Sequence, residues 1–197
     1  MSSTNFHYFH PSDNVAPNAT VTVQTGTEDA NYPLANCTSL AYAKIAAPSR
    51  LSGFTGAWQF DFGSAQRVDA AVIWHNFDAG LAVSLQGHAS ASWGSPTLTT
   101  SLTVPAKRGD GHTVKIYKDL TGVAGYSTGG FRYWRLNVSG TNSAAIGVKV
   151  LFFSTIRNLS RNYKWGFQTF EKQVGLDLAT DALVPWAYDY GVGLRQL

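Results

Sequence analysis

Histidine, cysteine and acidic side chains are the groups with which this chain could perform catalysis or bind a metal. His7 and His10 have an H-x-x-H spacing, but neither a helix nor an adjacent carboxylate is predicted there, as a metal site would need. His75 ends a predicted strand with no nucleophile or orienting acid beside it. No G-x-S-x-G, Walker or dinucleotide-binding motif occurs. We therefore expect no catalytic activity, no metal and no cofactor.

The acidic residues and the single cysteine lead to the same expectation. Glycoside hydrolysis needs two carboxyl groups across a cleft, and the sequence nominates no such pair among its twelve acidic residues. Five of these lie at turn-like positions: Asp13, Asp29, Asp78, Asp110 and Asp119. Cys37 is the only cysteine, which excludes a disulfide within the chain and a cysteine-based zinc site.

Composition narrows the classes of partner. Charged residues make up 14% of the chain, the formal net charge is +3, and no run of Lys or Arg exceeds two residues. Nucleic-acid binding would need a basic stripe, so none is expected. No segment approaches the roughly 18 apolar residues of a membrane span, and the first residues do not resemble a signal peptide. We expect neither membrane insertion nor secretion.

Trp93 is the best candidate for ligand binding, with His88 and His112 as further candidates. It lies in the loop-like stretch Ala89-Ser-Ala-Ser-Trp-Gly-Ser95. An exposed aromatic side chain can stack on a sugar ring or fill a partner's pocket. The alternative is a tryptophan folded back as a lid over the end of the domain. Trp58, Trp74 and Trp134 fall in strand patterns and are expected in the core.

These residues must be positioned by short strands in which apolar and polar residues alternate. Val21 and Val23 share one face of an expected strand at 20–25, and Trp58, Phe60 and Phe62 share a face of another that ends at Gly63. Further strands are expected at 68–75, 81–85, 98–104, 112–117, 131–138 and 144–153, the last covered on both faces. A helical turn is possible in 34–45. Gly-rich turns between short strands favour an all-β antiparallel sandwich, with extended N-terminal loops and a C-terminal arm.

The last segment differs from the rest because it mixes aromatic side chains with arginines. This is the composition of a protein–protein interface, and the alternative is one more pair of strands capping the domain. The expected division is an N-terminal extension at 1–14, the sandwich at 15–155 and a docking arm at 156–197. The candidate interface residues are Arg157, Arg161, Tyr163, Trp165, Phe167, Phe170, Trp186, Tyr188 and Tyr190.

Three stretches resemble the discoidin-like (F5/8 type C, galactose-binding-like) jelly-roll family. They are Trp58-Gln-Phe-Asp-Phe-Gly63, Arg67-Val-Asp-Ala-Ala-Val-Ile-Trp-His-Asn76 and Phe131-Arg-Tyr-Trp-Arg-Leu136. In that family an early strand reads roughly W-x-x-D-L-G and a late one R-Y-x-R-L. The resemblance covers residues 15–155. The residues themselves agree with it: we expect Arg132 or Arg135, which flank the late strand, to pair with Asp61 or Asp69 across the sheet.

The His-Asn variant of the second stretch resembles modules of tailed-bacteriophage virion proteins. This resemblance implies a non-enzymatic structural protein of a phage tail, baseplate or head appendage, made in the host cytoplasm and located in the virion. Its partners would be other virion proteins and copies of itself, docked through an oligomeric interface. The alternative is a carbohydrate-binding module that attaches to a host glycan. Some family members bind calcium, but the loops here lack an acidic cluster.

Overall fold

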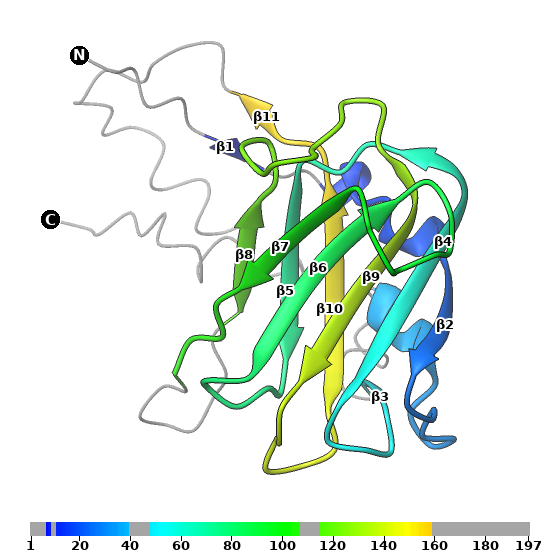
Figure 1. Ribbon diagram of the computed structural model, residues 1–197, viewed down its shortest axis with the longest axis vertical. Coiled ribbons are helices and arrows are strands. Elements are labelled where there is room, and N and C mark those ends of the chain that lie inside the picture. Colours follow the sequence, from blue (N-terminus) through cyan, green and yellow to red (C-terminus); the bar gives the residue numbers. More distant parts are fainter. Residues whose placement is uncertain (1–6, 9–10, 40–47, 107–114, 159–197) are drawn as a thin grey trace, which may run out of the picture. The chain divides into compact units, whose positions relative to one another are not determined.

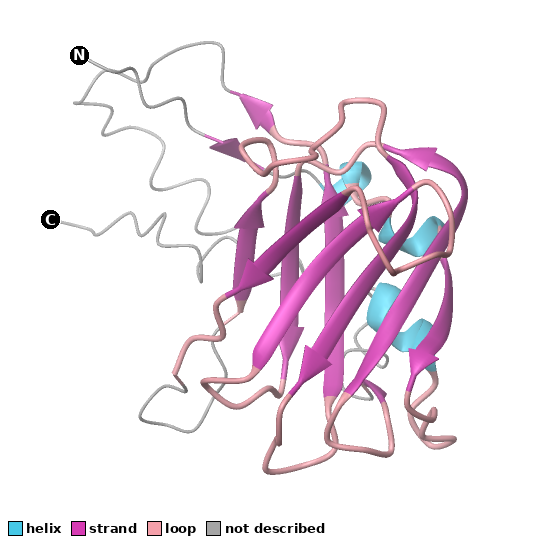
Figure 2. Ribbon diagram, in the orientation of Figure 1, coloured by secondary structure: helices cyan, strands magenta, loops and turns pink. Residues whose placement is uncertain are grey.

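The computed structural model describes residues 7–8, 11–39, 48–106 and 115–158. Within them the chain forms strands and three short 3-10 turns (Figures 1 and 2), and these turns are too short to cross a bilayer. The turns are η1 (Pro11–Asp13), η2 (Ala16–Asn18) and η3 (Leu34–Thr38). His112 and the expected strand residues 112–114 lie outside the described residues.

Two antiparallel sheets stack face to face in the unit His7–Arg157 (Figure 1). The five-stranded sheet has the order β2 (Thr20–Thr25), β4 (Gly56–Gln66), β9 (Phe131–Ser139), β6 (Ala82–His88), β7 (Leu98–Leu102). The four-stranded sheet has the order β3 (Ser49–Arg50), β10 (Gly147–Ser154), β5 (Ala70–His75), β8 (Ile116–Asp119). Two short strands, β1 (His7–Tyr8) and β11 (Arg157–Asn158), form a separate pair. The expected all-β antiparallel sandwich is confirmed.

Aromatic side chains join the two sheets. Phe153 of β10 packs against Phe60 of β4 and Trp134 of β9, with ring centroids 5.6 and 5.5 Å apart. Trp58 is fully buried and donates its Nε1–H to Ser49 Oγ at 2.8 Å. These contacts place the core between the sheets, because alternate residues of each strand point to the same face.

Strand β10 is buried on both faces, as its continuous apolar sequence predicts. Leu151 and Phe153 belong to the core, whereas Val150 and Phe152 alternate with them and are also buried. The strand lies inside its sheet, between β3 and β5.

Two expectations about the strands are wrong. Trp74 does not lie in the core: it is half-buried on the outer face of the four-stranded sheet, with Lys149 Nζ 5.0 Å and Lys115 Nζ 5.2 Å from its ring centroid. Strand β5 is apolar on both sides, so alternation alone did not fix which face Trp74 takes. Gly63 does not end β4. It adopts φ 72° at an irregularity in the pairing with β9, and the strand continues to Gln66.

Candidate functional site

Polar side chains line the outer face of the five-stranded sheet. Gln59 of β4 is opposite Arg135 of β9, which is in turn opposite Gln86 of β6. In the next row Asp61 is opposite Tyr133, which is opposite His88. Residues directly opposite in an antiparallel sheet share a face, and the core-facing neighbours Trp58, Phe60, Trp134 and Leu136 occupy the other one. We call this surface, together with Trp93, the polar face.

Trp93 lies on the polar face because the loop between β6 and β7 folds back across β9 toward β4 (Figure 1). Its indole Nε1 donates a hydrogen bond of 2.9 Å to Gln59 Oε1. The Arg135 guanidinium carbon lies 4.8 Å from its ring centroid, and Arg135 Nε donates to Gln86 Oε1 at 2.6 Å. The indole is half-buried. It is therefore neither a free loop side chain nor a lid over the end of the sandwich, as the two sequence-based alternatives had it.

His88 holds the end of the same loop. Its Nδ1 accepts the backbone N–H of Thr97 at 3.1 Å and lies 2.8 Å from Thr97 Oγ1. The carbonyl oxygen of Thr97 would lie 2.0 Å from a Cβ added at Gly125, so the loop between β8 and β9 packs closely against the β6–β7 loop. Gly125 also has φ 83°. The structure thus brings two of the three predicted ligand-binding residues, Trp93 and His88, to one hairpin.

Asp61 and Arg132 neutralise each other at the edge of the polar face. Arg132 donates from Nε to Asp61 Oδ1 at 2.8 Å and from a terminal nitrogen to Oδ2 at 3.0 Å. Asp61 Oδ1 also accepts the N–H of Gly63. The Arg132 hydrogen bonds lower the pKa of Asp61 below its usual value. Of the arginine–aspartate pairs expected from the sequence, this is the one that forms among the described residues, and it leaves Asp61 occupied at both oxygens.

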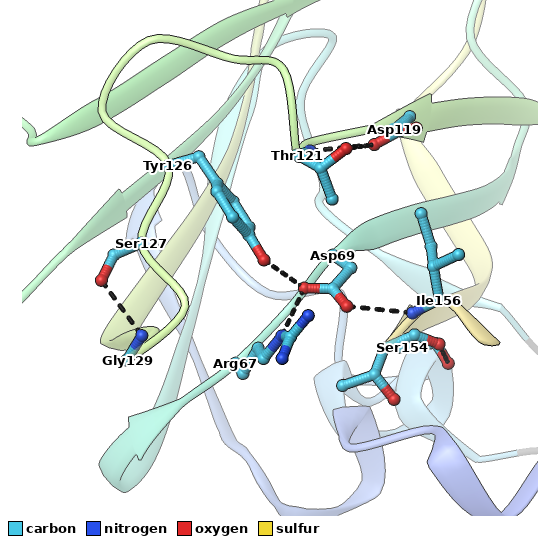
Figure 3. Close-up of polar contacts among 10 residues, drawn as sticks. Arg67, Asp69, Asp119, Thr121, Tyr126, Ser127, Gly129, Ser154 and Ile156 are labelled. Carbon is cyan, nitrogen blue, oxygen red and sulfur yellow. Dashed lines mark hydrogen bonds and ion pairs between the residues drawn. The ribbon is translucent and has the colours of Figure 1, made fainter. Parts of the chain in front are cut away.

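Asp69 forms a second polar cluster, at the start of β5 (Figure 3). It accepts hydrogen bonds from Arg67 Nε at 2.7 Å, from the Tyr126 hydroxyl and from the N–H of Ile156 at 3.1 Å. Burial raises the pKa of Asp69, but these hydrogen bonds and the Arg67 charge outweigh it, so the pKa is lowered overall. A buried carboxylate with this many donors anchors structure: it ties the loop that carries Tyr126 and Gly125 to β5 and to the end of β10.

Two further groups with potential reactivity, Cys37 and His75, are buried. Cys37 is buried in η3 and donates to the Leu34 carbonyl, and burial raises the pKa of its thiol to about 12. His75 is buried and stacked on Phe77, with ring centroids 4.6 Å apart. Within the described ranges no group of three or more His, Cys, Asp or Glu could hold a metal ion. What the polar face offers is hydrogen bonding and stacking.

Nearly all of the predicted interface residues lie outside the part of the chain that the structure describes. Arg157 lies in β11, and the remainder fall outside the described residues: Arg161, Tyr163, Trp165, Phe167, Phe170, Trp186, Tyr188 and Tyr190. The docking arm and its boundaries therefore stay predictions. Sequence reasoning missed Gln59, Gln86 and Tyr133, because only the strand register shows that they share a face with Trp93.

Several solved structures have a similar fold. A fucose binding module from Streptococcus pneumoniae has a TM-score of 0.51 at 9% identity, covering 73% of this chain and 98% of its own. The lectin domain of Lectinolysin, complexed with Lewis B antigen, has a TM-score of 0.51 at 9% identity over 72% of this chain and 96% of its own. SpGH29 has a TM-score of 0.50 at 14% identity over 74% of this chain, which spans only 28% of that longer protein. The fold is a discoidin-like β-sandwich.

At these identities the likeness establishes the fold alone. No known family profile matches the sequence, and no curated protein matches it. The β6–β7 loop that carries Trp93 departs from one end of the sandwich. None of these findings bears on the predicted virion role.

Proposed function

We propose that this chain is a carbohydrate-binding module whose ligand contacts the polar face. The observation that carries the proposal is the fixed indole of Trp93, held by Gln59 and Arg135 beside a row of amide and guanidinium groups. An aromatic ring covers the apolar face of a pyranose, while planar polar groups hydrogen-bond to its hydroxyls. The solved structures of the same fold, a fucose binding module and a lectin domain, support this reading.

The side chains of the polar face are preorganised for such a ligand. Gln59 and Gln86 belong to strands, and their contacts with Trp93 and Arg135 limit the rotamers of both larger side chains. Side chains that are already ordered lose less entropy when a ligand binds. The activity proposed for the polar face is binding.

A glycan array followed by titration calorimetry on the bound glycan tests the proposal. Trp93→Ala should weaken binding by up to about tenfold, the scale of one lost aromatic contact. Trp74→Ala is the matched control, because Trp74 is also a half-buried tryptophan beside cationic groups, but on the other sheet. Equal affinity of the Trp93→Ala variant and the unmodified protein, or an array without hits, would refute the proposal.

Docking into a virion remains a second proposal, supported by the aromatic composition of residues 157–190, which also include Arg157 and Arg161. It predicts self-association of the full chain, measured by light scattering after size exclusion. Replacing Trp165 and Trp186 by serine should then yield monomers. A full chain that is monomeric at all concentrations would count against this role.

A further inference from the structure

The charges of the polar face do not balance. The five strands that form it carry three charged side chains, Asp61, Arg132 and Arg135, when histidine is neutral. Asp61 and Arg132 form a two-point ion pair and cancel. Arg135 is left as the net charge of the sheet's outer face.

Arg135 has no carboxylate partner within the part of the chain that the structure describes. Its Nε donates a hydrogen bond to Gln86, and the Trp93 indole contacts one face of its guanidinium. Its two terminal nitrogens have no acceptor among the described residues, and neither is buried. They form the outward end of a planar fork, the geometry that binds a carboxylate or sulfate at two points.

The surroundings of Arg135 make its charge more available than that of an ordinary surface arginine. The side chain is half-buried, and burial lowers its pKa. A partly desolvated cation gains more from an anion than one surrounded by water, because fewer water contacts are lost when the pair forms. Gln86 and Trp93 also fix the guanidinium in one orientation.

We infer that the ligand of the polar face is an acidic glycan, whose carboxylate or sulfate group is bound by the terminal nitrogens of Arg135 beside the Trp93 indole. This inference rests on the proposed carbohydrate binding and names the class of sugar. Gln59 and Gln86 would contact the neighbouring hydroxyls, since they lie on either side of Arg135.

The test is an array of acidic glycans printed beside their neutral counterparts: uronic acid oligomers and their methyl esters, sialylated and desialylated chains, sulfated and desulfated chains. We expect the acidic member of a pair to bind about tenfold or more tightly than the neutral one, as one charge-assisted contact allows. The pair that responds identifies the carboxylate or the sulfate. Binding should weaken when NaCl rises from about 50 to about 500 mM.

Variants separate this inference from the proposed function. Arg135→Gln should abolish the preference for the acidic member, Arg135→Lys should keep part of it, and Lys118→Gln removes a positive charge from the other sheet as the control. Thermal unfolding confirms that each variant folds. If the acidic and neutral members bind equally well, and both lose binding in the Trp93→Ala variant, the preference for an acidic glycan is refuted. The proposal of carbohydrate binding is then still supported. An array without hits would overturn both.

Discussion

The guanidinium carbon of Arg135 lies 4.8 Å from the ring centroid of Trp93, and this contact attaches the β6–β7 loop to the sheet. The loop reaches across β9, so that the indole also bonds to Gln59 of β4. Cation–π contacts at such partly exposed sites contribute about 0.5–1 kcal/mol. Two modest contacts therefore fix the orientation of an aromatic ring on a surface where solvent still reaches it.

Trp93 and Trp134 should differ sharply in what they contribute to stability. Trp134 is 1% exposed and packs on Phe131 and Phe153, so Trp134→Ala should cost about 3–5 kcal/mol. Trp93→Ala removes only the contacts that attach the loop to the sheet, and should lower the free energy of unfolding by about 1 kcal/mol. Urea denaturation followed by circular dichroism measures both. Comparable losses would show that the indole of Trp93 is part of the core.

The close approach of the two loops makes Gly125 irreplaceable. An alanine Cβ there would lie 2.0 Å from the Thr97 carbonyl oxygen, and φ is 83°. Gly63 is the matched control, because it has φ 72° but open space around it. Gly63→Ala should cost about 1–2 kcal/mol from the backbone alone, and Gly125→Ala distinctly more. Two-dimensional NMR should show shifts at His88 and Thr97 for Gly125→Ala only. Equal costs would mean that the loops do not touch.

Stability should fall in acid because of Asp69. Its pKa in the folded protein is below the ordinary 3.8, so its contribution is fully present above the unfolded pKa and is lost as pH falls through the folded one. We expect the free energy of unfolding to drop from about pH 5 downward. Asp69→Asn, which leaves Arg67 and Tyr126 with a weaker acceptor, should cost about 2–3 kcal/mol at neutral pH and flatten the acid slope.

Asp61 also contributes to the decrease of stability in acid, because its pKa in the folded protein is lowered too. The control is Asp61→Asn, which should leave the contribution of Asp69 in place. A wild-type stability that stays constant between about pH 5 and pH 2 would contradict both assignments.

Cys37 should be unreactive while the protein is folded. Only the thiolate reacts with disulfide reagents, and burial raises the thiol pKa to about 12. Ellman's reagent at pH 8 should therefore release no colour from the native protein and one equivalent in urea, since the chain has one cysteine. Rapid labelling of the native protein would show that η3 opens readily.

The strands were predictable because each carries its own pattern. The alternation at 20–25 gives β2 with the same bounds as the structure, and Phe131–Val138 matches β9 within one residue. These predictions depend on neighbouring residues only. The 3-10 turn η3 begins at Leu34, where a helical turn was expected, and residues 40–45 of that expectation lie outside the described ones.

The polar face was not predictable, because its members meet through pairings distant in sequence. Gln59, Gln86 and Arg135 come from three strands and are aligned by register. The sequence led us to expect that Arg132 or Arg135 pairs with Asp61 or Asp69, but it left the choice open. Arg132 forms an ion pair with Asp61, whereas Asp69 accepts hydrogen bonds from the nearby Arg67 and from Tyr126 of a later loop.

The position of β10 has a consequence for how the chain acquires its structure. It lies between β3 and β5, pairing Gly147 with Arg50 and Leu151 with Ile73, yet it is made after both of them. On a ribosome the four-stranded layer thus lacks an interior strand until residue 154 has emerged. Such distant pairings form slowly. The apolar strand β5 therefore stays unpaired on one edge during synthesis, and a chaperone that binds exposed apolar segments would protect it from aggregation.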